Sequence, residues 1–168
     1  MTDDAHTTPV AATLGLSHAV LWVSDPKRSA DFYATALGLI VKIDGDEAVF
    51  MSSPGSATDH DLGLFKAPIL QPPHPRQIGL YHLAWEVATL ADLRAAKTRL
   101  TDMGALVGEN NHGVSRSLYC QDPDGIEFEI MWEVPEHLLD HDAPQNTSLD
   151  FEADFAHFGA DTPGRGAS

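Results

Sequence analysis

The sequence predicts an α+β fold in which two tandem strand–helix–three-strand modules form one curved, eight-stranded mixed sheet, with the helices outside. The first observation is an internal repeat: residues 16–23 (LSHAVLWV) and 80–87 (LYHLAWEV) align without a gap at an offset of 64. The second is that the same order of elements follows each copy. Because a four-stranded sheet with one helix cannot bury both of its faces, two such modules should lie side by side and enclose a cavity.

The first module begins with a strand over residues 16–23, which are rich in β-branched and large apolar residues. Ser24 or Asp25 can then cap a helix whose first turn holds Pro26. Gly38 can end this helix. Three short strand-like runs, separated by turn residues, complete the module: residues 39–43, 47–51 and 62–65.

The second module repeats this order after a proline-rich, extended linker over residues 67–78. Its first strand is predicted over residues 80–87. Thr89 can cap the helix that follows, with Asp92 placed for a capping box, and Gly104 can close it. Three further strand-like runs and one tight turn complete this module: strands over residues 105–108, 115–120 and 126–132, and the turn over residues 122–125.

Beyond the two modules, the sequence predicts two less regular segments. We expect the following organisation: a flexible leader over residues 1–14, module one over 15–66, the linker over 67–78, module two over 79–133 and an acidic tail over 134–168. The tail holds seven acidic residues against one arginine, with three phenylalanines among them. We expect this tail to be partly ordered and to dock over the sheet or on a neighbouring chain.

Composition excludes several classes of function. The 168 residues carry a formal net charge of −15, and a surface this acidic repels phosphate backbones, so we expect no nucleic-acid partner. No apolar run reaches the roughly 18–20 residues of a membrane helix, so we expect no membrane association. The single cysteine, Cys120, excludes an intrachain disulfide, and the first ten residues lack the character of a secretory signal. We therefore expect a cytoplasmic protein.

Two histidines at equivalent positions of the repeat, together with a carboxylate on the last strand, suggest a metal site inside the curved sheet. His18 and His82 occupy the same place in the two repeats. Alternation along the last strand places Glu127 and Glu129 on one face, away from its apolar residues. Two imidazoles and one carboxylate from neighbouring strands form a facial triad that leaves positions open for substrate and O2. Such a ligand set suits Fe(II), with Mn(II) as the alternative.

Residues 110–129 (NNHGVSRSLYCQDPDGIEFE) resemble the signature of the type I extradiol ring-cleavage dioxygenases. In that signature a histidine precedes an apolar–tyrosine pair, an Asp-Pro-x-Gly turn and a metal-binding glutamate. The matching residues are His112, Leu118, Tyr119, Asp122, Pro123, Gly125 and Glu129. The resemblance extends over about residues 15–133 to the vicinal oxygen chelate superfamily, which includes glyoxalase-like and bleomycin-resistance-like proteins.

The resemblance implies a role for each matching residue. The metal ligands would be His18, His82 and Glu129. His112 would act as the acid–base residue, Tyr119 would hydrogen-bond the substrate, and His60 would be a second, weaker catalytic candidate. The implied reaction inserts O2 into a catechol-type substrate and opens its ring to a muconic-semialdehyde-type product. We also expect a homodimer or higher homo-oligomer, because exposed sheet edges often pair.

Two other functions are compatible with the same fold. A glyoxalase-like metal-dependent lyase or isomerase usually takes a fourth protein ligand from the last strand of its first module. Here that strand, residues 62–66 (LGLFK), offers no carboxylate. A non-catalytic module that binds a small molecule would need no metal ligands. The sequence departs from the dioxygenase pattern at Glu127 and in the acidic tail, and it holds one pair of modules where many extradiol enzymes hold two.

Overall fold

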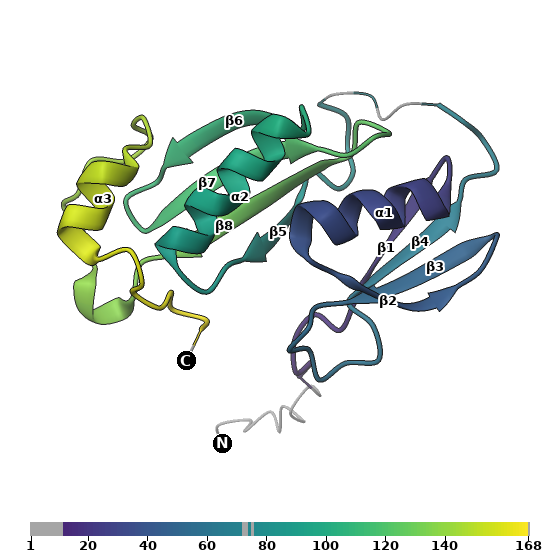
Figure 1. The fold of residues 1–168 in the computed structure, drawn as a ribbon, viewed down its shortest axis with the longest axis horizontal. Helices are drawn as coiled ribbons and strands as arrows, with labels where there is room; N and C mark the ends of the chain where they lie inside the picture. The colour runs from purple at the N-terminus through teal and green to yellow at the C-terminus, as the bar shows by residue number, and fades with distance from the viewer. Residues whose placement is uncertain (1–11, 72–73, 75, 168) are drawn as a thin grey trace, which may run out of the picture.

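The structure is a computed structural model that describes residues 12–71, 74 and 76–167. Two modules lie side by side, each with a four-stranded sheet and one long helix (Figure 1). Module one consists of β1 (Ala19–Val23), α1 (Pro26–Leu37), β2 (Ile40–Asp44), β3 (Ala48–Ser52) and β4 (Leu62–Lys66). Module two consists of β5 (Leu83–Glu86), α2 (Leu90–Asp102), β6 (Leu106–Asn111), β7 (Ser115–Gln121) and β8 (Glu127–Glu133). Most of the expected leader lies outside the described residues.

Both modules have the same topology, as the internal repeat predicts. The strand order is β1-β4-β3-β2 in the first sheet and β5-β8-β7-β6 in the second. In each sheet the first strand of the module pairs in parallel with the last, and the other pairs are antiparallel. The first and last strands of a module are therefore neighbours, which places the residues around His18 and His82 beside the last strand of their own module.

Local capping explains where the two long helices begin. The Asp25 carboxylate accepts hydrogen bonds from the backbone N–H groups of Lys27 and Arg28, at 3.0 and 3.2 Å. Thr89 and Asp92 form the predicted capping box at the start of α2. Gly38 follows α1 with a φ of 73°, a left-handed conformation that glycine adopts without steric cost.

Side chains rather than strand pairing join the two modules. The Tyr33 hydroxyl of α1 donates to Asp122 of module two at 3.1 Å. The Asp124 carboxylate accepts from the backbone N–H and the hydroxyl of Ser24, at 2.7 and 2.6 Å, and pairs with Arg28 at 2.6 Å. The turn between β7 and β8 is thus fastened to the start of α1.

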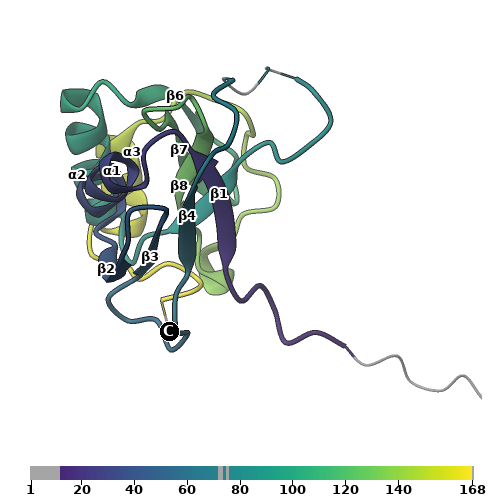
Figure 2. The same cartoon turned by 90° about the vertical axis from the view of Figure 1, so that its right-hand side faces the viewer.

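The two helices lie on the same side of the two sheets, as Figure 2 shows. This arrangement confirms the α+β class with outside helices. However, the eight strands form two separate sheets of four within the described residues, not one continuous half-barrel. The contacts between α1 and the β7–β8 turn, together with hydrogen bonds from Arg99 of α2 to the Ala36 carbonyl of α1, join the modules.

The core of each module lies between its helix and the helix-facing side of its sheet. The fully buried strand residues on these faces include Val23, Met51, Leu62 and Leu64 in module one, and Leu118, Phe128, Ile130 and Trp132 in module two. Side chains alternate along a strand, so the residues between these face the opposite side of the sheet. Glu129, between Phe128 and Ile130, is therefore directed away from α2.

The acidic tail is ordered and packs on module two. It holds two helices, the short 3₁₀ helix η1 (Glu136–Leu138) and α3 (Phe151–Phe158). Asp154 of α3 forms an ion pair with Arg116 of β7 at 2.7 Å, and both side chains are buried. Before α3, Thr147 exchanges two backbone hydrogen bonds with Asn111 at the end of β6. Figure 1 shows the tail turning around this end of the sheet to place α3 next to α2.

No helix in the described part of the chain is long and apolar enough to cross a membrane.

Candidate active site

The candidate site lies on the face of the module-two sheet opposite α2, where a histidine and a carboxylate meet. His82 directly precedes β5, and Glu129 lies in β8, where its backbone pairs with Ala84 of β5. Nε2 of His82 lies 3.0 Å from Oε2 of Glu129. Because Glu129 is only 7% exposed, its carboxylate needs a partner to compensate for lost hydration, and this imidazole is that partner.

Tyr119 of β7 lies on the same face, beside the His82–Glu129 pair. Its backbone pairs with that of Glu129 across the two strands, so the two side chains share one face. The ring centroids of Tyr119 and His82 are 6.0 Å apart. Burial raises the pKa of Tyr119, and the charge of Glu129 raises it further. The phenol therefore stays protonated at neutral pH and can donate a hydrogen bond.

His112 reaches this face from the turn between β6 and β7. Its Nε2 lies 2.7 Å from the Tyr119 hydroxyl, so the structure brings these two predicted site residues into contact. The backbone N–H of His112 donates to the carbonyl of Ser115 at 3.0 Å, which closes the turn. Gly113, with a φ of 79°, takes the left-handed conformation that this turn requires. The turn geometry therefore directs the imidazole toward β7.

A second carboxylate, Glu127, is half-buried and lies two residues before Glu129 in β8. Its backbone pairs with Gln121, and strand alternation places it on the same face as Glu129, as predicted. Two carboxylates on one face of a sheet make that face attractive to a cation.

His18 and His60 lie together on the other sheet. His18 directly precedes β1 and is exposed, and its ring centroid lies 4.5 Å from that of His60. Nδ1 of His60 lies 3.0 Å from the Asp59 carboxylate. Within the residues that the structure describes, no three His, Cys, Asp or Glu side chains are grouped so that they could hold a metal ion. The structure thus brings together two predicted ligands, His82 and Glu129, and leaves His18 on module one.

An aromatic row continues from these two histidines across the module-one sheet. His60 contacts Phe50 edge-on at 4.9 Å between centroids, and Phe50 contacts Phe65 at 5.6 Å. Phe65 in turn packs against Trp22 at 6.0 Å, and Trp22 is 64% exposed. This face of module one is therefore apolar and aromatic, whereas the equivalent face of module two carries the ionisable groups.

Comparison with known proteins places the chain in a family. Residues 15–130 match the family model described as the Glyoxalase/Bleomycin resistance protein/Dioxygenase superfamily. The chain belongs to this superfamily. The matched residues cover both modules and every predicted site residue.

Similar curated proteins include two that are named as dioxygenases. Biphenyl-2,3-diol 1,2-dioxygenase 2 of Rhodococcus globerulus is 34% identical over 125 residues, which cover 72% of this chain and 65% of that protein. Catechol-2,3-dioxygenase of Bacillus subtilis is 28% identical over 143 residues, covering 82% of this chain and 50% of that protein. The matched region therefore spans between half and two thirds of these curated relatives.

A solved structure of the superfamily supports the fold. The glyoxalase/dioxygenase from Nostoc punctiforme superposes with a TM-score of 0.61 at 26% sequence identity. The match covers 75% of this chain and 97% of that one. The family match ends at residue 130, so the acidic tail, residues 134–168, lies outside it.

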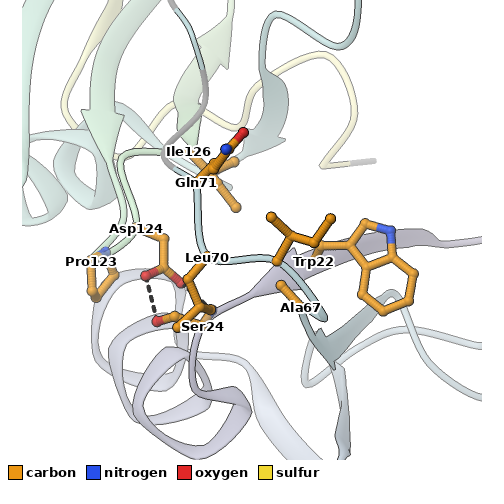
Figure 3. A pocket seen from close by; sticks show the side chains of 9 residues that line it. Trp22, Ser24, Ala67, Leu70, Gln71, Pro123, Asp124 and Ile126 are labelled. Carbon is orange, nitrogen blue, oxygen red and sulfur yellow. Dashed lines mark hydrogen bonds between the residues drawn. The ribbon is translucent and has the colours of Figure 1, made fainter.

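This superfamily domain also has a cavity of about 240 Å³ at the junction of its modules, which Figure 3 shows. It is lined by Trp22, Ser24, Ala67, Ile69, Leu70, Gln71, Pro123, Asp124 and Ile126. Burial raises the pKa of Asp124, but hydrogen bonds from Ser24 and the charge of Arg28 outweigh burial and leave it lowered. None of the predicted site residues lines this cavity. The carboxylate that does line it, that of Asp124, already joins the two modules through Ser24.

Two site residues were not predicted from the sequence. The side chains of Asn110 and Asn146 lie beside His112, with Asn146 Oδ1 at 3.2 Å from His112 Nδ1. Asn110 lies two residues before His112, within the dioxygenase-like segment. Asn146 lies in the tail, 34 residues after His112, and no local pattern connects the two.

Asp61 supports the loop that presents His60, and its removal should lower stability at neutral pH. Its carboxylate accepts hydrogen bonds from Ser53 N, Ser56 Oγ and Thr58 Oγ1, at 2.7, 2.7 and 2.6 Å. Burial raises the pKa of Asp61, but these hydrogen bonds outweigh burial and lower it to about 2. The stabilisation is therefore complete at neutral pH and is lost as the pH falls from about 4 to about 2.

We expect Asp61→Ala to lower the free energy of unfolding at pH 7 by about 1 kcal/mol, because solvent screening weakens a partly exposed carboxylate. Urea denaturation at several pH values measures this effect. The difference in unfolding free energy between the wild type and Asp61→Ala should shrink below about pH 4. Asp31→Ala, at an exposed position of α1, is the matched control. A difference that stayed constant down to pH 2 would contradict the role of the Asp61 carboxylate.

Proposed function

We propose that this protein is a metal-dependent extradiol dioxygenase. It would insert both atoms of O2 into a catechol-type substrate and open the ring to a muconic-semialdehyde-type product. The observation that carries this proposal is the placement of two pairs, His82–Glu129 and Tyr119–His112, side by side on one face of a single sheet. The names of the relatives, biphenyl-diol and catechol dioxygenases, support the same substrate class.

The His82–Glu129 pair would supply two of the three proposed ligands of a divalent cation. An imidazole nitrogen and a carboxylate oxygen lie 3.0 Å apart at a buried position. Nδ1 of His82 is buried and has no hydrogen-bond partner among the described residues. A cation bound by this pair would neutralise a carboxylate that otherwise relies on one imidazole. We propose Fe(II), with Mn(II) as the alternative, because both accept nitrogen and oxygen ligands.

His18 remains the proposed third ligand, on the basis of its equivalence to His82 in the repeat. In the structure it lies against His60 on the other sheet, so its contribution needs its own test. We expect His18→Ala to weaken metal binding, measured as metal content after dialysis. Unchanged metal content in this variant would leave His82 and Glu129 as the ligands and remove His18 from the site.

The residues around the pair can position a catechol and move its protons. A bound Fe(II) would lower the pKa of a catechol hydroxyl and mediate electron transfer to O2. The Tyr119 hydroxyl would donate a hydrogen bond to a substrate oxygen. Nε2 of His112, 2.7 Å from that hydroxyl, would accept a proton and later return it. His60 is the second acid–base candidate, and its ring lies on the module-one sheet beside His18.

The decisive experiment measures oxygen uptake by protein loaded anaerobically with Fe(II), against a panel of catechols. Ring-fission absorbance identifies the product. We expect uptake with formation of a coloured ring-opened product. No uptake by protein that holds one metal ion per chain would overturn the proposal and favour a glyoxalase-like reaction. Absence of both metal and uptake would favour a small-molecule-binding module.

Replacing His112 with alanine tests the acid–base role. We expect His112→Ala to keep its metal and to lose turnover by about 10²–10⁴-fold, the usual contribution of a positioned acid–base group. His141→Ala removes an exposed histidine of the tail and should behave as the wild type. Turnover of His112→Ala equal to that of the control would show that another group moves the proton.

A further inference from the structure

A loop of the acidic tail, between η1 and α3, contacts His112 on the side away from Tyr119. Oδ1 of Asn146 lies 3.2 Å from Nδ1 of His112 and also accepts a hydrogen bond from Nδ2 of Asn110 at 3.1 Å. The same Nδ2 lies 3.4 Å from Nδ1 of His112, where it would favour the opposite tautomer, but its shorter contact is the one with Asn146. Asn146 lies beyond residue 130, where the superfamily match ends. We propose that Asn146 is a positioning residue that fixes the tautomer of His112.

The chemistry of the amide determines which tautomer is favoured. The oxygen of a side-chain amide carries no hydrogen, so its hydrogen bond with Nδ1 requires the proton on Nδ1. In the neutral ring this leaves Nε2 as an acceptor. When no substrate is bound, the Tyr119 hydroxyl, 2.7 Å from Nε2, then donates to it. Tyr119 therefore donates to His112, and His112 donates to Asn146.

The backbone holds Asn146 in place for this role. The next residue, Thr147, accepts a hydrogen bond from Asn111 N at 3.0 Å and donates one to Asn111 O at 3.1 Å. This pairing anchors the loop to the end of β6, directly beside His112. Asn146 itself has a φ of 58°, a left-handed conformation that asparagine tolerates better than most residues. The proposed role thus requires residue 146 to combine a positive φ with a side-chain oxygen that reaches His112.

The catalytic consequence rests on the proposed function. A proton acceptor at Nε2 can take a proton from Tyr119 or from a substrate hydroxyl bound beside it. If the proton of the neutral ring were on Nε2, that nitrogen would be a donor and could not accept one. The tail would therefore contribute to the reaction through Asn146, although no tail residue is a predicted catalytic group.

Two substitutions at residue 146 separate the effect of the amide group from the effect of the backbone conformation. Asn146→Gly removes the side chain but keeps easy access to a positive φ. Asn146→Asp tolerates the same conformation and restores an oxygen acceptor. Gln145→Ala is the control, because it removes a neighbouring amide that makes no hydrogen bond within the described part of the chain.

Long-range proton–nitrogen NMR spectra of the full chain without added metal report the tautomer directly. They are recorded at about pH 8, above the ordinary histidine pKa of about 6.5. We expect His112 in the wild type, in Asn146→Asp and in the control to carry its proton on Nδ1. Asn146→Gly should show a mixture or the reverse tautomer. An unchanged Nδ1 proton in Asn146→Gly would overturn the proposal.

Turnover provides the second measurement. We expect Asn146→Gly to lower kcat for ring cleavage by about tenfold with little change in KM, and Asn146→Asp to recover most of the loss. Equal kcat in Asn146→Gly and the wild type would overturn the catalytic consequence. If the wild type cleaves no catechol, the proposed function fails, and the NMR spectra still decide whether Asn146 fixes the tautomer.

Discussion

Replacing Glu129 with glutamine should abolish metal binding and reduce ring cleavage by at least about a thousandfold. A bound metal supplies several kcal/mol of stabilisation to developing charge, and each 1.4 kcal/mol corresponds to about a factor of ten in rate. The amide of glutamine has nearly the shape of the carboxylate but no charge, so it is a poor ligand for a divalent cation. The glutamine side chain can still hydrogen-bond Nε2 of His82, because that nitrogen lies 3.0 Å from Oε2 of Glu129 in the wild type.

Metal content and thermal unfolding should be measured on the same samples. We expect Glu129→Gln to lose its metal while the metal-free protein unfolds near the temperature of the metal-free wild type. Glu133→Gln is the matched control, because Glu133 ends the same strand, and its backbone pairs with Ser115 away from His82. Full metal content in Glu129→Gln would contradict the proposed ligand set.

The elements of the fold could be predicted because their signals are local. The capping box of Thr89 and Asp92, the cap at Asp25 and the glycine after α1 are short patterns, and each lies where the structure places a helix end. We also expected His82 and Glu129 to lie on neighbouring strands. Strand pairing then places Glu129 beside His82 without any further information.

The relation between the modules could not be predicted, because it depends on pairs that are far apart in sequence. Tyr33 and Asp122 are 89 residues apart, and their hydrogen bond is one of the contacts that set how the sheets meet. No periodicity encodes such a contact. The equivalence of His18 and His82 in the repeat shows that they hold the same place within their modules, but it does not specify the distance between the modules. The expected homo-oligomer stays a prediction.

The contacts of the tail with the candidate site also join residues that are far apart in sequence. We expected the tail to be partly ordered and docked, but its composition does not specify the docking contact, the buried ion pair Arg116–Asp154 between residues 38 apart. The docked tail also brings Oδ1 of Asn146 to 3.2 Å from Nδ1 of His112. The sequence therefore suggested His112 and Tyr119 as candidates but gave no sign of Asn146, the residue that we propose orients His112.

Replacing Asp154 with alanine should lower the free energy of unfolding by about 3–5 kcal/mol, because the Arg116 guanidinium would remain buried without a countercharge. Arg116 and Asp154 are 6% and 8% exposed in their side chains. Nε of Arg116 donates to both oxygens of Asp154, at 2.8 and 2.9 Å. The guanidinium also donates to the carbonyls of Gly113 and Ser115, so it is fixed beside the turn that carries His112.

A matched control lies on the same helix. Glu152 of α3 pairs with Arg94 at 2.8 Å, but both side chains are largely exposed, so Glu152→Ala should cost less than about 1 kcal/mol. Urea denaturation measures both variants. The double replacement Arg116→Met with Asp154→Leu should recover most of the stability, because neither charge is then left buried. A loss in Asp154→Ala no larger than that in Glu152→Ala would show that the pair is solvated.

The same variants test whether the ion pair holds the tail against the site. Hydrogen exchange at the backbone N–H of Thr147, which donates to Asn111 O, reports the docking of the loop that carries Asn146. We expect this exchange to accelerate in Asp154→Ala and to stay slow in Glu152→Ala. Because an uncompensated buried charge favours opening of the segment around it, the loop should detach before module two unfolds. Equal protection of Thr147 in both variants would mean that the pairing with Asn111 holds the loop without help from α3.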